Sequence, residues 1–230
     1  MPANAVRSVS SNQDDIYRNL EAVVRKYAAT TFLRPIAEHT RESFAIANKF
    51  IESFAAGNTL VLDSGCGTGE STIHLAKKFP GIPVIGTDKS AVRLSKAQRG
   101  DIPPNAIWIR AELIDFWRLA LEKVMAGEWN VIHHALYYPN PWPKESEATR
   151  RFHLHPIFPT LLKLSPVTEL RTNWEIYARE FAEAARIASD ALPLKLSAEC
   201  SSFAPAIPET AFERKYKEAD QKLYRVLVRR

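Results

Sequence analysis

The glycine-rich segment at residues 63–69 constrains this chain more than any other feature. It reads Asp-Ser-Gly-Cys-Gly-Thr-Gly, follows the apolar run 59–62 and precedes a helix-like segment. A strand, a tight glycine turn and a helix in this order build a nucleotide-sized pocket in a doubly wound sheet. Gly65, Gly67 and Gly69 can adopt backbone angles that other residues avoid, and they let a ligand approach the main chain. We therefore expect these glycines to line a ligand site.

Two acidic residues accompany this turn. Asp63 precedes the first glycine, and Asp88 ends the next apolar run, 83–87. An acid at the second position can accept both hydroxyls of a ribose. A carboxylate at Asp63 would repel a pyrophosphate, and the spacing differs from the Gly-x-Gly-x-x-Gly of dinucleotide enzymes. The favoured ligand is therefore a cation with an amino-acid moiety, such as S-adenosylmethionine (SAM). A dinucleotide and a turn without a ligand are the alternatives.

The composition is typical of one globular domain. The chain has 230 residues, of which 46% are hydrophobic and 25% are charged, and this length is ample for a full core. We expect a disordered tail at 1–13 and a single domain over 14–230, with a helical extension at 14–56. The chain has no apolar run of membrane-spanning length and no signal-peptide pattern, which predicts a cytoplasmic protein. Its two cysteines form no zinc cluster, and no metal site is expected.

Strands and helices alternate after the N-terminal helices. The predicted strands with their following helices are 59–63 with 70–79, 82–87 with 90–98, 105–110 with 113–125, 129–136 with 156–164, and 167–172 with 174–189. Two late strands, 194–200 and 222–228, are joined by a proline-containing loop without a predicted crossover helix, so we expect them to be antiparallel. The sequence thus predicts an α/β fold, a Rossmann-like doubly wound sheet of seven strands, mostly parallel with an antiparallel C-terminal strand.

A proline-rich loop follows the fourth predicted strand. It reads Tyr-Pro-Asn-Pro-Trp-Pro-Lys at residues 138–144. Its prolines cannot extend a central strand, so they make a stiff loop at the carboxyl edge of the sheet, where ligands bind. Trp142 could stack on a nucleobase or anchor the loop by packing. Asn140 could contact a ligand or only shape a turn.

Taken together, these motifs resemble the bacterial tRNA (guanine-N7-)-methyltransferase family. The family pattern Phe-Pro-Asp-Pro-Trp-Pro-Lys is matched at 138–144, Thr-Asp-Trp-x-x-Tyr at 172–177, and Thr-x-Phe-Glu at 210–213. The resemblance covers about residues 40–230. It implies a SAM-dependent methyltransferase that acts on tRNA. Guanine N7 carries a free lone pair, so in-line methyl transfer to it needs no general base.

The resemblance also implies roles for individual residues. Cofactor contacts are implied at Asp63, Asp88, Glu112 and Asn140. Asn140 is also the candidate catalytic residue, because it would hold the reacting base. Substrate contacts are implied at Lys144, Asn173, Thr210 and Glu213, and the basic tract adds Arg150 and Arg151 as candidate phosphate contacts. Helix capping is the structural alternative for Asn173, Thr210 and Glu213.

The chain departs from the family pattern at four positions where a charge is lost or reversed. Asn140 and Asn173 replace aspartates, and Glu145 and Glu147 stand in the basic tract. An aspartate can accept from guanine N1–H and N2–H together, whereas an asparagine offers one acceptor and one donor and fits adenine or cytosine edges better. The alternative functions are a SAM-dependent methyltransferase for another base, RNA or small molecule, and a non-catalytic SAM- or RNA-binding protein. The oligomeric state stays open.

Overall fold

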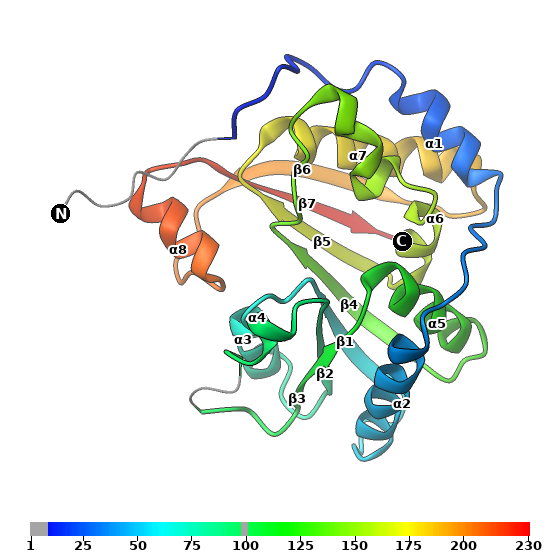
Figure 1. The fold of residues 1–230 in the computed structure, drawn as a ribbon, viewed down its shortest axis with the longest axis vertical. Helices are drawn as coiled ribbons and strands as arrows, with labels where there is room; N and C mark the ends of the chain where they lie inside the picture. The colour runs from blue at the N-terminus through cyan, green and yellow to red at the C-terminus, as the bar shows by residue number, and fades with distance from the viewer. Residues whose placement is uncertain (1–8, 98–100) are drawn as a thin grey trace. The chain divides into compact units, whose positions relative to one another are not determined.

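The protein, described here by a computed structural model over residues 9–97 and 101–230, contains a mixed seven-stranded sheet (Figure 1). The strand order is β3-β2-β1-β4-β5-β7-β6. The strands are β1 Thr59–Ser64, β2 Val84–Asp88, β3 Ala106–Arg110, β4 Asn130–Tyr137, β5 Val167–Thr172, β6 Ser197–Phe203 and β7 Leu223–Arg229. Strand β1 pairs in parallel with β2 and β4, β2 pairs in parallel with β3, and β6 is antiparallel to β7. The predicted fold class is confirmed.

The helices follow the predicted alternation with one addition. They are α1 Leu20–Ala28, α2 Glu38–Glu52, α3 Glu70–Lys78, α4 Ala91–Leu94, α5 Leu113–Met125, α6 Phe158–Leu164, α7 Glu175–Ala191 and α8 Ala211–Glu218, with short 3-10 helices η1 Glu145–Arg150 and η2 Phe152–Leu154. Helix α8 lies between the two late strands, where we predicted no crossover helix, and it begins at the capping-box spacing of Thr210 and Glu213. No helix within the described ranges is long and apolar enough to cross a membrane.

The chain divides into two compact units, each made of segments that are separated in sequence. The unit that we call the glycine-loop unit comprises Leu33–Tyr137 and Thr160–Thr168. The unit that we call the proline-loop unit comprises the chain up to Phe32, Tyr138–Pro159 and Glu169–Arg230. The prediction of one domain over 14–230 stays a prediction.

The glycine-loop unit has a core of aliphatic strand residues covered by aromatic helix residues. Strand β2 is buried along its whole length and β1 nearly so, as expected for central parallel strands with both faces covered. Helix α2 packs against α5 and β3, and α3 packs against β1 and β2. Phe44 of α2 stacks on Trp129 with a centroid distance of 4.7 Å and meets the edge of Phe116 at 5.1 Å. These contacts fix α5 and the strand ends that carry the candidate site.

The proline-loop unit is organised around α7. This helix packs against α1, β6 and β7. Its buried face is rich in alanine, including Ala178, Ala182 and Ala185, and small side chains let neighbouring elements approach closely. Phe181 adds an edge-to-face contact with Phe158 at 5.4 Å. Helix α7 therefore provides a rigid support for the loops that it contacts.

The segment before α1 overlaps the predicted disordered tail. Residues 1–8 lie outside the described residues. Ser11 Oγ donates to the carbonyl of Pro143 at 2.6 Å, and the buried Gln13 side chain donates to Glu180 at 2.7 Å. Residues 11–13 thus have polar partners from distant parts of the chain, and the disordered tail over 1–13 stays a prediction.

Candidate functional site

The glycine turn joins β1 to α3 through three residues in the left-handed backbone region. The φ angles are +76° at Gly65, +58° at Gly67 and +78° at Gly69. The N–H groups of Gly65 and Cys66 donate to the carbonyl of Thr87 at 2.8 and 3.0 Å, which ties the turn to β2. A Cβ placed on Gly67 would meet nothing within 4 Å. This part of the main chain is therefore open to a ligand, as the glycine spacing predicts.

Trp108 of β3 explains why two nearby positions are glycine. A Cβ on Gly69 would lie closer than 3.0 Å to the Trp108 indole, and a Cβ on Gly86 would collide with Thr72 and press against Trp108. Gly86 and Trp108 are register partners on neighbouring strands. Sequence reasoning missed this contact. The available signal was Gly86 itself, because a glycine inside a central strand often marks a close approach.

Asp63 lies near the end of β1 and is buried beneath the first turn of α3. Its Oδ2 accepts hydrogen bonds from Ser71 Oγ and Thr72 Oγ1, each at 2.7 Å. A negative charge at a helix N-terminus is favourable because the unpaired N–H groups there carry partial positive charge. Asp63 thus fixes the helix that follows the glycine turn, and its direct contact with a cofactor stays a prediction.

Asp88 closes the glycine turn from the end of β2. Its Oδ2 accepts from the N–H of Gly67 at 3.1 Å, and its Oδ1 accepts from the N–H of Ser90 at 2.8 Å. Arg93 lies 3.5 Å from Oδ2. Since a carboxylate has about four lone-pair sites, these three contacts leave one site, on Oδ1, for a ribose hydroxyl. The structure therefore brings Asp88 and the open Gly67 together, as the sequence predicts.

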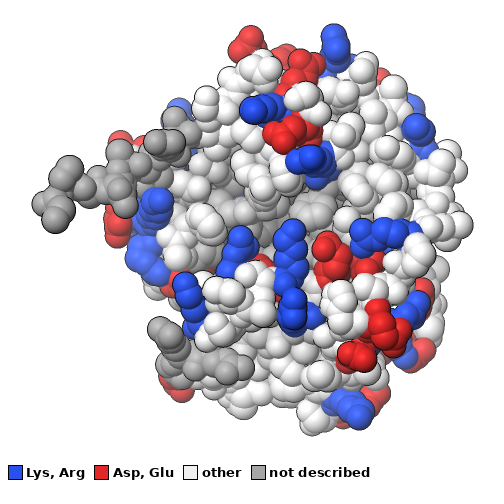
Figure 2. All heavy atoms as spheres, in the orientation of Figure 1, with Lys and Arg blue, Asp and Glu red and all other residues white. Residues whose placement is uncertain are grey.

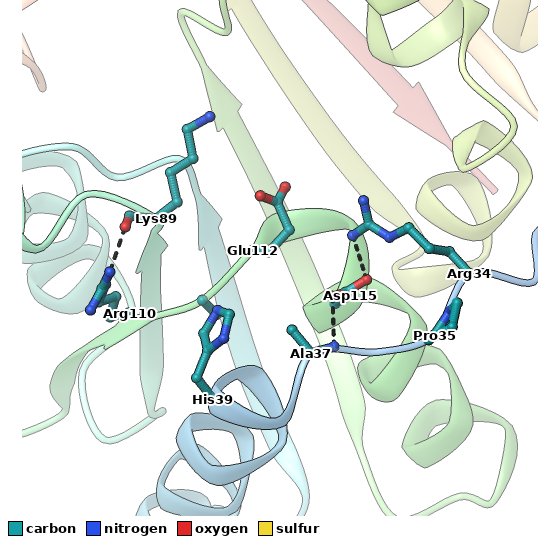
Figure 3. A pocket seen from close by; sticks show the side chains of 9 residues that line it. Arg34, Pro35, Ala37, His39, Lys89, Arg110, Glu112 and Asp115 are labelled. Atoms are coloured by element: carbon teal, nitrogen blue, oxygen red, sulfur yellow. Dashed lines mark hydrogen bonds and ion pairs between the residues drawn. The ribbon is translucent and has the colours of Figure 1, made fainter.

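A cavity of about 430 Å³ lies beside the ends of β2 and β3 (Figure 3). Lys89 and Arg110 line one side, and Arg34 and His39 come from the segment around the start of α2. Figure 3 shows the Glu112 carboxylate pointing into the open space, with no interaction drawn to the other lining residues. Glu112 is partly buried, and a carboxylate in this setting can accept a hydrogen bond from an exocyclic amine. The structure thus places Glu112 on a cavity that starts directly after Asp88.

Asp115 pins the segment before α2 beside this cavity. Its Oδ1 lies 2.7 Å from Arg34 Nη2, and its Oδ2 accepts from the N–H of Ala37 at 3.1 Å. Arg118 also donates to the Arg34 carbonyl. The Asp115 side chain is buried, so its charge depends on these partners. No pattern in the sequence indicates this role, because the partners are about 80 residues apart and their pairing follows from the tertiary fold.

A buried polar chain lies just before the glycine turn. Ser64 Oγ accepts from Trp117 Nε1 at 2.8 Å and lies 2.8 Å from His134 Nε2. Burial and, secondarily, the charge of His133 lower the pKa of His134 to about 3. The imidazole is therefore neutral, and its Nε2 can accept the hydroxyl proton of Ser64. This chain fixes the orientation of the residue that precedes Gly65.

Cys66 is a neutral thiol within the turn. Burial, followed by the negative charges of Asp63 and Asp88, raises its pKa well above the ordinary value. Because the thiolate is the reactive form of cysteine, this environment makes Cys66 inert. Across the described parts of the chain, no group of three or more His, Cys, Asp or Glu side chains is placed to hold a metal ion.

In the proline-loop unit, the loop after β4 contains two strained residues. Tyr138 and Trp142 have φ angles of 52° and 45°, a region that residues with a Cβ seldom adopt. Asn140 is exposed, and its Oδ1 accepts from the N–H of Trp142 at 3.2 Å. Asn140 therefore shapes the turn, and its contacts with a cofactor or a base stay predictions. Backbone strain of this kind persists only where surrounding structure enforces it, often at functional sites.

The predicted basic tract divides into exposed and buried members. Lys144 and Arg150 are exposed, and the Arg150 guanidinium lies 4.6 Å from the centroid of the Trp142 ring. Arg150 also pairs with Glu147 at 3.2 Å. Figure 2 shows basic and acidic side chains intermingled on the face drawn. Because both side chains are exposed, a phosphate contact remains open to Lys144 and Arg150.

Arg151 corrects one prediction. Its side chain has no exposed surface and forms two bonds to Glu180, at 2.9 and 2.7 Å. It also donates to the carbonyl of Trp142 through Nε at 3.2 Å and Nη2 at 2.9 Å. A guanidinium in this position cannot face a substrate in this structure. Arg151 instead holds the loop that carries Trp142.

Glu180 of α7 is the centre of this buried cluster. Besides Arg151, its carboxylate accepts from Gln13 Nε2 and the N–H of Tyr17, each at 2.7 Å, and lies 2.8 Å from His153 Nε2. Burial by itself raises the Glu180 pKa, but the bond from His153 and the nearby positive charge outweigh it and lower the pKa to about 2. Sequence reasoning missed Glu180, which reads as one of several charged residues along a helix.

The last motif forms a capped helix start and a second buried ion cluster. Thr210 Oγ1 accepts from the N–H of Glu213 at 3.0 Å, which confirms the capping interpretation. Glu213 has no exposed surface and lies 2.8 Å from Arg171. Because the Glu213 side chain is fully buried, it offers no surface for the predicted substrate contact in this structure. Asn173 is partly buried, and Trp174 rather than Asn173 occupies the cap of α7; the capping alternative for Asn173 is therefore wrong, and its substrate contact stays a prediction.

Three aromatic rings adjoin this helix start. Phe212 stacks near Tyr138 and Tyr216, with centroid distances of 6.0 and 6.1 Å. Phe212 is 54% exposed. Exposed aromatic rings are surfaces on which nucleobases can stack.

Comparisons with known proteins show that the chain is similar to methyltransferases. Residues 57–226 match a family described as "Putative methyltransferase". Proteins named "tRNA (guanine-N(7)-)-methyltransferase" are similar to the chain. The Thermotoga maritima protein is 27% identical across 78% of this chain and 56% of its own length, the Mycobacterium avium protein 30% across 70% and 62%, and the Stutzerimonas stutzeri protein 25% across 72% and 70%. The chain thus spans less than two thirds of the first two relatives.

Solved structures of methyltransferases share the fold at low sequence identity. "Structure of an Antibiotic Related Methyltransferase" aligns with a TM-score of 0.55 and 11% identity over 88% of this chain and 97% of that chain. The 16S rRNA methyltransferase KamB aligns with a TM-score of 0.52 and 15% identity over 86% and 96%. These similarities concern the fold, and they agree with the Rossmann-like architecture predicted from the sequence.

Proposed function

Because the chain belongs to the putative methyltransferase family, we propose that it is a SAM-dependent enzyme that methylates guanine N7 in tRNA. The observation that carries the proposal is the glycine turn closed by Asp88, with Glu112 on the adjoining cavity. The substrate rests on relatives named tRNA (guanine-N(7)-)-methyltransferase and on the motifs at 138–144 and 210–213. tRNA as the partner and the cytoplasm as the location belong to the same proposal.

The glycine-loop unit fits SAM at three points. Gly67 leaves the main chain open, Asp88 has unused acceptor capacity for a ribose hydroxyl, and Glu112 faces the cavity where an adenine amine would lie. Neutral and acidic groups at these points suit a sulfonium cation better than a pyrophosphate. When bound, SAM would supply an electrophilic methyl group. The protein residues would hold and orient it.

The transfer itself places few demands on acid–base chemistry. Guanine N7 has a free lone pair, so the protein must align it with the methyl group and exclude water. The stiff proline loop, with Asn140 exposed in it, supports such alignment. The neutral His134 and the protonated Cys66 are consistent with a site that moves no proton.

A second candidate function is methylation of another base. Asn140 uses its Oδ1 within the loop, toward the N–H of Trp142. The amide N–H donors therefore remain for a ligand, and donors suit the ring acceptors of adenine or cytosine better than guanine N1–H and N2–H.

One experiment decides between these candidates. The purified protein is incubated with labelled SAM and total tRNA from cells that lack the homologous activity, and the RNA is digested to nucleosides for mass spectrometry. Labelled 7-methylguanosine supports the proposal, and another labelled nucleoside supports the second candidate. The absence of label, with SAM binding shown separately, would contradict tRNA as the substrate and favour a non-tRNA substrate or a non-catalytic role.

A matched variant sharpens this result. Asn140→Asp restores the acid of the family pattern. We expect it to raise guanine-N7 methylation if the wild-type amide is a weakened version of that acid. A loss of activity in Asn140→Asp would show that the asparagine serves a different base.

A further inference from the structure

We propose that residues 11–17 act as a clasp that holds the proline loop in its substrate-binding shape, with Gln13 as the positioning residue. The clasp is a feature of the proline-loop unit alone. Its consequence for methylation rests on the proposed function. Neither the motifs nor the relatives' names assign a role to this segment.

The clasp contacts the loop directly on both sides of Lys144. Ser11 Oγ donates to the carbonyl of Pro143 at 2.6 Å. Asn12 Oδ1 accepts from the N–H of Glu145 at 3.1 Å, the first residue of η1. These bonds satisfy a carbonyl and an N–H that would otherwise depend on water. The main chain around Lys144 is therefore fixed by a segment more than 130 residues away in sequence.

Gln13 links the clasp to the buried ion cluster. Its Nε2 donates to Glu180 Oε1 at 2.7 Å, and its Oε1 accepts from Arg151 Nη2 at 2.9 Å. One amide thus bridges the acid and the base of a buried pair, using both its donor and its acceptor. Apolar or acidic side chains cannot make both bonds. Gln13 therefore supplies hydrogen bonds that the buried charges of Arg151 and Glu180 require.

Arg151 passes this restraint to the strained residue of the loop. It donates twice to the carbonyl of Trp142, whose φ angle of 45° is disfavoured for a residue with a Cβ. Asn140 Oδ1 then accepts from the N–H of Trp142. The conformation of Trp142, and through it the orientation of Asn140, depends on a guanidinium that Gln13 and Glu180 hold in place.

A loosened clasp has a specific expected consequence. The loop would sample other conformations, because a left-handed φ is disfavoured for tryptophan and only the local bond to Asn140 would still hold it. Binding of the base and the RNA should weaken. SAM affinity should change less than RNA binding, because Asp63, Asp88 and Glu112 lie in the glycine-loop unit, and Asn140 is the one proposed cofactor contact that the loop carries.

The test compares Gln13→Met with Asp14→Asn. Methionine keeps the volume of Gln13 and removes its side-chain bonds to Glu180, to Arg151 and to the Asp15 carbonyl, whereas the Asp14 side chain is exposed and lies outside these contacts. Hydrogen exchange measured by mass spectrometry on peptides covering 139–151 should be about tenfold faster in Gln13→Met and unchanged in Asp14→Asn. Unchanged exchange in a folded Gln13→Met protein would overturn the clasp.

Kinetics on tRNA test the functional part. In Gln13→Met, the KM for tRNA should rise by about fivefold to tenfold, while the SAM dissociation constant stays within about twofold of wild type. Faster loop exchange with unchanged tRNA kinetics would overturn the consequence for substrate binding. If the wild-type protein methylates no RNA, the proposed function fails, and the exchange measurement still decides whether the clasp exists.

A second variant covers the case in which Gln13→Met does not fold. Ser11→Ala removes the bond to the Pro143 carbonyl and the local bonds between Ser11 Oγ and the main chain of Gln13, and it leaves the side chains of the buried cluster unchanged. We expect exchange at 142–145 to be about threefold faster, with a thermal midpoint close to wild type. Exchange equal to that of Asp14→Asn would contradict the proposal.

Discussion

The glycine-loop unit and the proline-loop unit hold their predicted site residues in different ways. In the glycine-loop unit, Asp63 and Asp88 accept bonds from hydroxyl and main-chain donors, and Glu112 faces a cavity. In the proline-loop unit, Arg151 and Glu213 are fully buried against opposite charges. The first arrangement leaves a carboxylate able to accept a ligand. The second uses a residue of a sequence motif as an internal support, and a predicted binding motif can therefore owe part of its composition to the scaffold.

The largest expected effect concerns the buried pair. Glu180→Ala leaves Arg151 buried without its counter-charge, so the free energy of unfolding should fall by about 3–5 kcal/mol. Urea denaturation measures this loss. Glu183→Ala, which removes an exposed pair with Arg186 on the same helix, should cost less than about 1 kcal/mol. Equal losses in the two variants would show that the buried pair supports the proline-loop unit no more than an exposed pair does.

The pH dependence of stability should report the same cluster. The folded-state pKa of Glu180, about 2, lies below its ordinary value of 4.5. Its contribution to stability is therefore fully present above about pH 4.5 and is lost as the pH falls toward 2. The loss should be about 3 kcal/mol. It is measured as the difference in unfolding free energy between wild type and Glu180→Gln, and a difference that does not shrink on acidification would contradict the assignment.

A pair of glycine substitutions tests whether the glycine-loop unit depends on backbone geometry. Gly69→Ala combines a left-handed φ with a collision against Trp108, so it should cost about 2–3 kcal/mol of stability. Gly67→Ala has a similar φ and open space, so it should cost about 1 kcal/mol. Thermal unfolding measures both. Equal costs would show that Trp108 does not press on the turn.

Asp88→Ala should weaken SAM binding by about 1.5–2 kcal/mol, because a charge-assisted hydrogen bond to the ribose is lost. The same change also removes the acceptor for Gly67 and Ser90, so the variant should be less stable as well. Asp88→Asn keeps one acceptor oxygen, so its SAM affinity should fall between those of the wild type and Asp88→Ala. Calorimetric titration with SAM provides the affinities, and unchanged affinity in Asp88→Ala would remove Asp88 from the ribose role.

The smallest expected effect separates two adjacent arginines. Arg150→Ala removes an exposed contact with the Trp142 ring and should change stability by about 0.5–1 kcal/mol at most. If Arg150 meets a phosphate, tRNA binding should weaken and the slope of log affinity against log salt should decrease by about 1. Filter binding at several salt concentrations measures this slope. An unchanged slope would leave Lys144 as the exposed phosphate contact in this tract.

The alternating architecture and the glycine turn could be predicted because they depend on local patterns. Apolar runs of strand length and a glycine turn specify the elements without knowledge of their neighbours. Helix α8 could not be predicted in the same way. It is short and highly charged, and its start is stabilised by Glu213, whose partner Arg171 is 42 residues away. Tertiary contacts overrode a weak local pattern there.

The burial of Arg151 also could not be predicted from the sequence. Arg150 and Arg151 have identical chemistry and adjacent positions, yet one is exposed and the other is fully buried. Only the position of Glu180, on a helix 29 residues further along, distinguishes them. Gln13 is a similar case, because a polar residue in a polar segment gives no sign of a buried partner.

Trp108 has a consequence for how this protein can vary through evolution. Its indole fills the space that Gly69 and Gly86 leave empty, next to Thr72. A side chain at position 69 would collide with Trp108, a side chain at position 86 would collide with Thr72, and a smaller residue at 108 alone would open a void beside the turn. These positions should therefore covary, so that homologues with alanine at 69 carry a smaller residue at 108, and homologues with alanine at 86 a smaller residue at 72.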